Sequence, residues 1–240
     1  MGIRIPPLVV VAADSAGTYT LRGLDKPSAV SPICKIHQSG NIFFAVSGII
    51  NDPITGFNVP TIVAQASRSK DAIIDRVEEA ARRLRSALPK ELKYLRSEDP
   101  SAYKRRFEAP KYAVAVLFFA FENKVPVLMA IVFEATSSPS GAIHIAMRRS
   151  SCPGSDCPNG VLNLYLGRHE AIDRFTADHH IRVLSPYDIV AIARSLVELE
   201  IVDASDEVQP PVDVLLVDAD GPRWINKKKE CPDIQSHPAH

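Results

Sequence analysis

The spacing of apolar residues switches between a strand pattern and a helix pattern only a few times along the chain. This small number of switches constrains the fold most strongly. Up to residue 48 the pattern is that of successive β-strands, with short apolar or alternating runs between turns. Helical spacing follows, strand patterns return between residues 111 and 166, and helical spacing resumes before a last strand. Because helices come in two blocks, the order argues against a Rossmann or barrel fold, which repeats βαβ units. It favours two sheets packed face to face, with helices on each outer side.

The expected strands are apolar or alternating runs bounded by turn residues. A hairpin through Glu122-Asn123-Lys124 is the strongest of these patterns, and residues 18–32 are expected to form a loop. The strands are expected over 8–13, 33–36, 42–46, 111–121, 125–134, 142–148, 161–166 and 211–217.

Two amphipathic helices are expected, over 70–88 and 186–200, and they should cover opposite outer faces. Ser69 is the expected N-cap of the first and Pro89 its stop. The second opens with Ser185-Pro186-Tyr187-Asp188, which is a capping box with proline at the first helical position. Shorter helices are expected over 59–67, 100–107 and 168–178.

Length and charge limit the function classes. The 240 residues, with 46% apolar side chains, suit one large domain over 1–225, and the polar end over 226–240 is expected to be disordered. Lys plus Arg and Asp plus Glu each number 28, so a general nucleic-acid binder, which carries a basic excess, is not expected. The longest apolar runs, about ten residues, are too short to span a membrane, and no signal peptide opens the sequence.

Four cysteines are too few for a disulfide scaffold. Cys152 and Cys157 bracket a turn-rich loop and are read as free thiols, or as one loop disulfide if the protein is exported. Half of a zinc site is the other interpretation, but such a site needs four ligands. Cys34 and Cys231 lie far away with no CxxC partner, so no metal and no cofactor is expected.

The ordered set of segments resembles proteasome β-type subunits, including bacterial proteasome-like proteins. Gly2-Ile3-Arg4, a turn and the apolar strand ending in Asp14-Ser15 look like the opening of that family. The short strand around Lys35 and the strand ending Ser47-Gly48 follow in the family's order, and the likeness extends to about residue 218. The resemblance implies an α+β fold of the N-terminal nucleophile hydrolases, a four-layer αββα sandwich.

The resemblance also implies a chemistry. In the family a threonine at the mature N-terminus attacks a carbonyl carbon, and its own α-amine accepts the proton. By position Asp14 and Lys35 match the aspartate–lysine pair that activates the hydroxyl, and Gly48, or neighbouring Ser47, matches the oxyanion donor. Asp206 or Asp203 matches the aspartate near the amine. Asp14 could also be an ordinary turn residue. Lys35, however, is flanked by apolar residues and needs a partner, and Asp14 would be that partner.

The sequence departs from the family pattern at the nucleophile. The match places the threonine about three residues before Met1, where the printed sequence has none. Pro210-Pro211 stand where two glycines are usual, and Arg168 follows Gly167 where a serine is usual. Either the start is chosen too late, or the protein is a non-catalytic member.

Three functions therefore compete. One is a threonine-type peptide hydrolase; the others are a non-catalytic ring-forming or binding subunit and a small-molecule amidohydrolase. The resemblance implies self-association into a ring or other homo-oligomer and a peptide or amide substrate. Nucleic acid and membrane are not expected as partners. The cytoplasm is the expected compartment, or the exterior if a signal segment precedes Met1.

Overall fold

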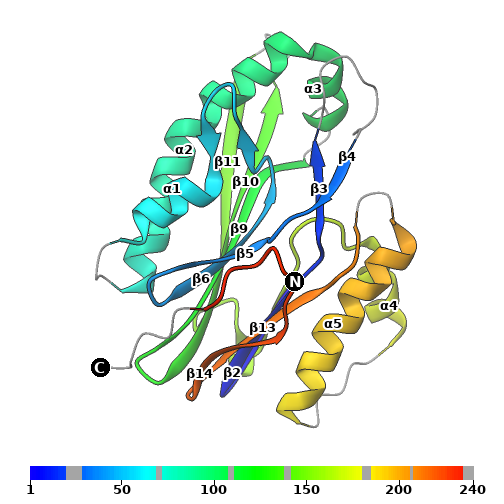
Figure 1. The fold of residues 1–240 in the computed structure, drawn as a ribbon. Helices are drawn as coiled ribbons and strands as arrows, with labels where there is room; N and C mark the ends of the chain where they lie inside the picture. The colour runs from blue at the N-terminus through cyan, green and yellow to red at the C-terminus, as the bar shows by residue number, and fades with distance from the viewer. Residues whose placement is uncertain are drawn as a thin grey trace.

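The structure is a computed structural model with two antiparallel five-stranded sheets and five α-helices among its described residues (Figure 1). It describes residues 1–19, 29–68, 72–107, 111–137, 142–179, 185–205 and 208–234. All strand pairs within these ranges are antiparallel, and the chain is an α+β protein, as the block order of the sequence predicts.

The first sheet contains the first and the last strands of the described chain. A turn at Pro6-Pro7 joins β1 (Gly2–Ile5) to β2 (Leu8–Ala13) and sets Gly2 opposite Val11. The same β1 pairs on its other side with β12 (Leu162–Leu164), with Gly2 opposite Leu164. In sheet order the strands are β12 (Leu162–Leu164), β1 (Gly2–Ile5), β2 (Leu8–Ala13), β13 (Asp213–Asp218) and β14 (Gly221–Asn226).

The second sheet is built around the long hairpin that the sequence predicts. Asn123 and Lys124 turn it with φ values of 50° and 64°, the left-handed backbone that two-residue hairpin turns require. Short pairs β3 (Ala16–Tyr19) with β4 (Ala29–Pro32), and β7 (Asn51–Asp52) with β8 (Phe57–Asn58), lie outside both large sheets. In order the second sheet is β11 (Ile143–Cys152), β10 (Val125–Ser137), β9 (Lys111–Glu122), β6 (Ile42–Gly48) and β5 (Ile36–Ser39).

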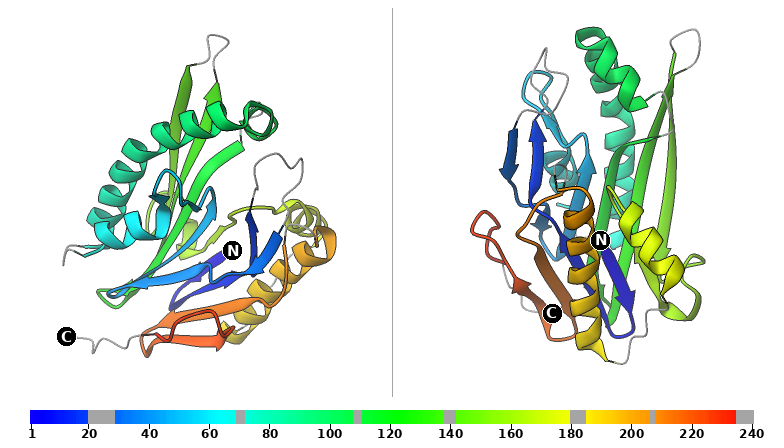
Figure 2. Two further views of the ribbon diagram at one scale, coloured as in Figure 1. Left: turned by 45° about the horizontal axis from the view of Figure 1, so that its top comes forward. Right: turned by 90° about the vertical axis from the view of Figure 1, so that its right-hand side faces the viewer.

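The helices lie on opposite sides of the pair of sheets (Figure 2). On one side, α1 (Val59–Ala66) and α2 (Ile73–Glu98) pack on the second sheet, and α3 (Pro100–Phe107) follows α2. On the other, α5 (Pro186–Asp203) packs on the first sheet and α4 (Glu170–Asp178) packs on α5. The prediction that the two main helices cover opposite faces agrees with this arrangement.

Alternation along the central strands divides the apolar core into three clusters. In β9, Val116 and Phe118 join the cluster under α1 and α2, whereas Leu117 and Phe119 join the one between the sheets. In β2 the odd residues face the other sheet and the even residues face α5. Both strands are therefore buried on two faces, which explains their uninterrupted apolar sequences.

Several boundaries differ from the sequence prediction. Helix α2 does not stop at Pro89: Leu88 and Leu92 are fully buried, and this packing outweighs the one backbone hydrogen bond that proline cannot donate. Its predicted N-cap, Ser69, lies outside the described residues. The loop predicted over 18–32 contains strand residues, namely the C-terminal end of β3 and all of β4.

The end of the chain was also mispredicted as far as it is described. Strand β14 occupies 221–226, where no strand was expected, and Lys228 and Cys231 beyond it are buried rather than disordered. Residues 235–240 of the predicted tail lie outside the described part of the chain.

Candidate functional site

An ion pair joins the ends of two strands where the sequence predicts it. Asp14 follows β2, and Lys35 stands just before β5 rather than on a strand as expected. The Lys35 Nζ lies 2.7 Å from Asp14 Oδ1, and the two side chains are only 18% and 15% exposed. The other carboxylate oxygen of Asp14 accepts the backbone N–H of Ala16 at 2.9 Å. Asp14 is thus both the turn residue and the partner that a half-buried lysine needs.

The backbone nitrogen of Met1 lies at the same end of the sheet. It donates to the Ala12 carbonyl oxygen at 2.8 Å, as a continuation of the β1–β2 pairing. Burial lowers the pKa of this amine to about 5; Asp14 opposes the shift and Lys35 adds to it. An amine at this place is therefore neutral near pH 7, and it feels the charges of both members of the ion pair.

Gly48 ends β6 at a place that admits no side chain. Its φ is +94°, and a Cβ there would lie 2.3 Å from the Ala113 carbonyl oxygen of β9. The preceding Ser47 hydroxyl is 3.1 Å from the Tyr112 hydroxyl. A Cβ on Gly167 would meet the same two hydroxyls, at 3.3 and 3.6 Å, so Gly167 lies against this strand end. The glycine at position 48 thus has a steric reason to be there, independent of any oxyanion.

The aspartate expected near the amine is not placed by the structure. Asp206 lies outside the described residues. The alternative, Asp203, ends α5 and pairs with Arg174 of α4 at 2.5 Å. Asp203 therefore ties two helices together, and the structure gives it no contact with Asp14 or Lys35.

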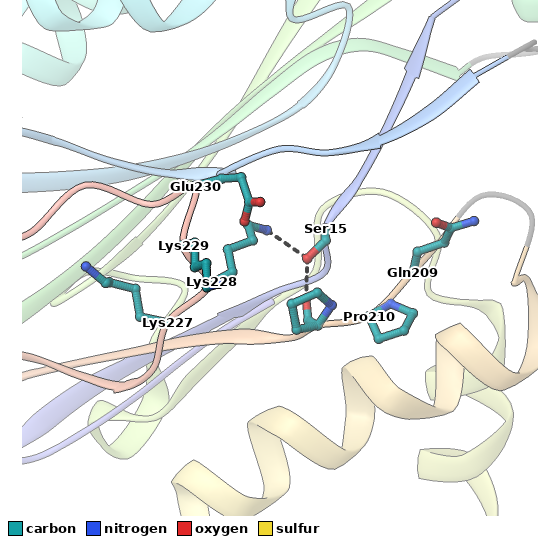
Figure 3. Close-up of a pocket in the computed structure, with 8 residues that line it drawn as sticks. Ser15, Gln209, Pro210, Lys227, Lys228, Lys229 and Glu230 are labelled. Atoms are coloured by element: carbon teal, nitrogen blue, oxygen red, sulfur yellow. Dashed lines mark hydrogen bonds between the residues drawn. The ribbon is translucent and has the colours of Figure 1, made fainter.

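A second polar cluster, which sequence reasoning missed, includes Ser15, the chain neighbour of Asp14; Figure 3 draws Ser15 and Lys228 of this cluster. The Lys228 ammonium lies 2.7 Å from Asp213 Oδ2 and donates to the Ser15 hydroxyl at 2.8 Å. That hydroxyl donates in turn to the Pro211 carbonyl oxygen. Asp213 is completely buried and Lys228 nearly so. Three consecutive lysines in a polar tail gave no sign that the middle one is buried.

A pocket of about 460 Å³ opens beside this cluster. Ser15 and Lys228 stand in its wall, and their hydrogen bonds are drawn in Figure 3. The Ser15 hydroxyl donates its hydrogen bond to a carbonyl oxygen and accepts one from the Lys228 ammonium. Neither partner is a base that could activate the hydroxyl as a nucleophile. The remaining lining residues are Gln209, Pro210, Pro211, Lys227, Lys229 and Glu230.

All four cysteines are in disulfides. Cys152 joins Cys157, which is one of the three alternatives expected for that loop. Cys34 joins Cys231 across 197 residues, although the sequence suggested no partner for either. Their sulfurs and the Asp213 carboxylate lie within 4.8 Å of one another, and the bonded sulfurs are not thiolate ligands for a metal. A pairing between residues so distant in sequence leaves no local signal.

Comparisons with known proteins give distant likenesses to solved structures. No protein-family model matches the chain, and no curated protein matches it. A solved structure, titled Anbu (Gly-1) mutant from Hyphomicrobium sp. strain MC1, is similar with a TM-score of 0.47 and 14% sequence identity. The alignment covers 95% of this chain and 85% of that one. Among the described helices, none is long and apolar enough to cross a membrane.

Proposed function

We propose that this protein is a proteasome-like amide hydrolase of the N-terminal nucleophile type, with the αββα sandwich of that class. The nucleophile would be a threonine, serine or cysteine preceding Met1. The observation that carries the proposal is the ion pair between Lys35 and Asp14, 2.7 Å long and half-buried, beside the start of β1. It supplies a fixed positive charge at the place where a residue added to β1 would arrive.

The strand register supports that placement. Because β1 runs antiparallel to β2 with Gly2 opposite Val11, Met1 stands opposite Ala12. Each further residue upstream would stand opposite the next residue of β2 and the loop after it. The third such residue would lie opposite Ser15, just past Asp14, if the pairing continued. Extension of β1 therefore leads past the ion pair.

The chemistry then follows from charge and proton affinity. The Lys35 ammonium would lower the pKa of a nearby hydroxyl, and Asp14 would keep the lysine charged and in place. The free α-amine of the first residue would take the hydroxyl proton as the oxygen attacks the carbonyl carbon. The protonated α-amine would then give its proton to the leaving amine as the C–N bond breaks, which leaves an ester, or a thioester for cysteine, on the first residue. Water would hydrolyse this acyl group to a carboxylic acid and regenerate the first residue.

The remaining roles rest on the resemblance. We propose Gly48, or Ser47 beside it, as the oxyanion donor and Asp206 as the group that orients the amine. The second candidate function is a non-catalytic subunit of the same fold. It is favoured by the departures from the family pattern at Pro210-Pro211 and Arg168.

The test is a protein extended by the codons upstream of Met1 and processed so that a Thr, Ser or Cys becomes the N-terminus. We expect turnover of a fluorogenic peptide, a small aryl amide or both, and the preference between them identifies the substrate class. Lys35→Ala should reduce the rate at least 100-fold, whereas Lys93→Ala on the exposed side of α2 should not change it. A stop codon upstream, or an extended protein that turns over neither substrate, would favour the non-catalytic subunit.

A further inference from the structure

The described end of the chain, residues 227–234, binds the immediate neighbours of both members of the ion pair. Lys228 donates to Ser15, which follows Asp14. Cys231 is bonded to Cys34, which precedes Lys35. We call residues 227–234 the clasp. Because its two attachments flank Asp14 and Lys35, displacement of the clasp would loosen the chain on both sides of the pair.

Each sulfur of the Cys34–Cys231 disulfide faces an oxygen that could accept a thiol proton. Cys34 Sγ lies 3.0 Å from the Ile36 carbonyl oxygen, and Cys231 Sγ lies 3.2 Å from Asp213 Oδ2. In the disulfide neither sulfur has a proton to donate; in the dithiol both would. Among the described residues, the sulfurs of Cys152 and Cys157 have no such acceptor. The first disulfide thus has a polar environment suited to both redox states.

We propose that Cys34–Cys231 is a reversible redox switch that fastens the clasp beside Asp14 and Lys35 when oxidised and, when reduced, releases the part of the clasp around Cys231. The inference does not depend on the proposed hydrolysis. When the Cys34–Cys231 disulfide opens, the clasp keeps only its non-covalent contacts, which are the Lys228–Asp213 ion pair and hydrogen bonds. Lys228 is the main non-covalent anchor, since its backbone N–H also donates to Asp213 Oδ1 at 2.8 Å.

The reaction requires a dithiol reductant. Cys34 is partly exposed and Cys231 is 3% exposed, so the reductant's thiolate attacks the sulfur of Cys34. The Cys34–Cys231 bond breaks, and the Cys231 sulfur leaves as a thiolate and takes a proton. The reductant's second thiol then displaces Cys34 and forms the reductant's own disulfide. Two electrons and two protons pass to the protein, and the dithiol is oxidised.

The test compares the full chain in oxidised form and after treatment with dithiothreitol. Alkylation with mass spectrometry should show Cys34 and Cys231 protected before treatment and labelled after it. Limited trypsin digestion should then cleave after Lys227 or Lys229 at least tenfold faster in the reduced protein. Equal cleavage in two samples whose redox states are verified by alkylation would overturn the release of the clasp. Alkylation of Cys34 and Cys231 before treatment would overturn the disulfide itself.

Two variants separate this disulfide from the other. Cys152→Ser with Cys157→Ser should keep the full response to the reductant, and loss of the response would assign it to the wrong disulfide. Cys34→Ser with Cys231→Ser should be cleaved fast under both conditions. If that variant does not fold, the wild-type comparison still decides. Reoxidation with glutathione disulfide should restore slow cleavage, and failure to do so would contradict reversibility.

The connection to the ion pair needs its own measurement. In the reduced protein an amine-acylating reagent should modify Lys35 several-fold faster, relative to exposed Lys93 as an internal reference. Unchanged labelling of Lys35 after proven release of the clasp would overturn the connection. This result would leave the proposed hydrolase untouched, because it concerns regulation and not the presence of a nucleophile.

Discussion

Asp14 and Lys35 stabilise each other at the residue scale, and a double-mutant cycle measures by how much. Asp14→Asn and Lys35→Met each leave a half-buried charge unpaired. The losses in the free energy of unfolding of the two single variants should therefore add up to more than the loss of the double variant. Denaturant unfolding should give a coupling energy of about 1–3 kcal/mol. The exposed pair Glu79–Arg82 on α2 is the control and should give less than about 1 kcal/mol. Equal couplings would mean that the Asp14–Lys35 pair is only a surface contact.

His37 should give the protein a pH-dependent stability. Burial lowers its pKa from 6.5 to about 4, and its ring stacks on Phe44 with centroids 5.2 Å apart. Between pH 6.5 and 4 the unfolded chain binds a proton that the folded chain does not, so the free energy of unfolding should fall as the pH falls. His37→Leu should flatten this part of the profile, while His144→Gln on exposed β11 should not. The same slope in wild type and His37→Leu would contradict the assignment.

The sequence predicts part of the candidate site. The resemblance to proteasome β-type subunits pairs Asp14 with Lys35, and a lysine between apolar neighbours requires an anion; the structure brings the two side chains together. Lys228 and Asp213 could not be paired, since their contact depends on how the end of the chain folds back. The Cys34–Cys231 bond was missed for the same reason.

At the scale of elements, helix α5 begins where its sequence says it should. The Ser185 side chain accepts the Asp188 N–H, and the Asp188 carboxylate accepts the Ser185 N–H at 2.6 Å. Ser185→Ala should lower the free energy of unfolding by about 1 kcal/mol, because the Asp188 backbone N–H loses the hydroxyl that accepts it. Ser195→Ala, on the exposed side of the same helix, should change it by less than about 0.5 kcal/mol. Similar losses in both variants, measured by chemical denaturation, would show that the cap adds nothing.

Other elements show where local patterns stop being informative. The long hairpin of β9 and β10 was predictable because its turn and its apolar runs are adjacent in sequence. The continuation of α2 past Pro89 was not, because proline usually ends a helix and here the burial of Leu92 decides otherwise. Strand β14 was also missed: its alternating burial depends on pairing with β13, and it begins with a Gly-Pro pair typical of turns.

At the scale of the whole molecule, we expect self-association. Tyr187 and Val202, near the two ends of α5, are 84% and 85% exposed, and the family that the sequence resembles forms rings through its helices. Light scattering coupled to gel filtration should give a mass well above 26.3 kDa. Tyr187→Glu with Val202→Glu should lower that mass. A clean monomer for the unmodified protein at micromolar concentration would contradict a ring.

The central claim is that the Asp14–Lys35 pair activates a nucleophile placed upstream of Gly2. The most direct measurement is the intact mass of the upstream-extended, processed protein after reaction with a β-lactone, followed by peptide mapping. We expect one acyl adduct per chain on the first residue, strongly reduced in Lys35→Ala and unchanged in Lys93→Ala. An unlabelled first residue, or equal labelling of all three proteins, would contradict the claim.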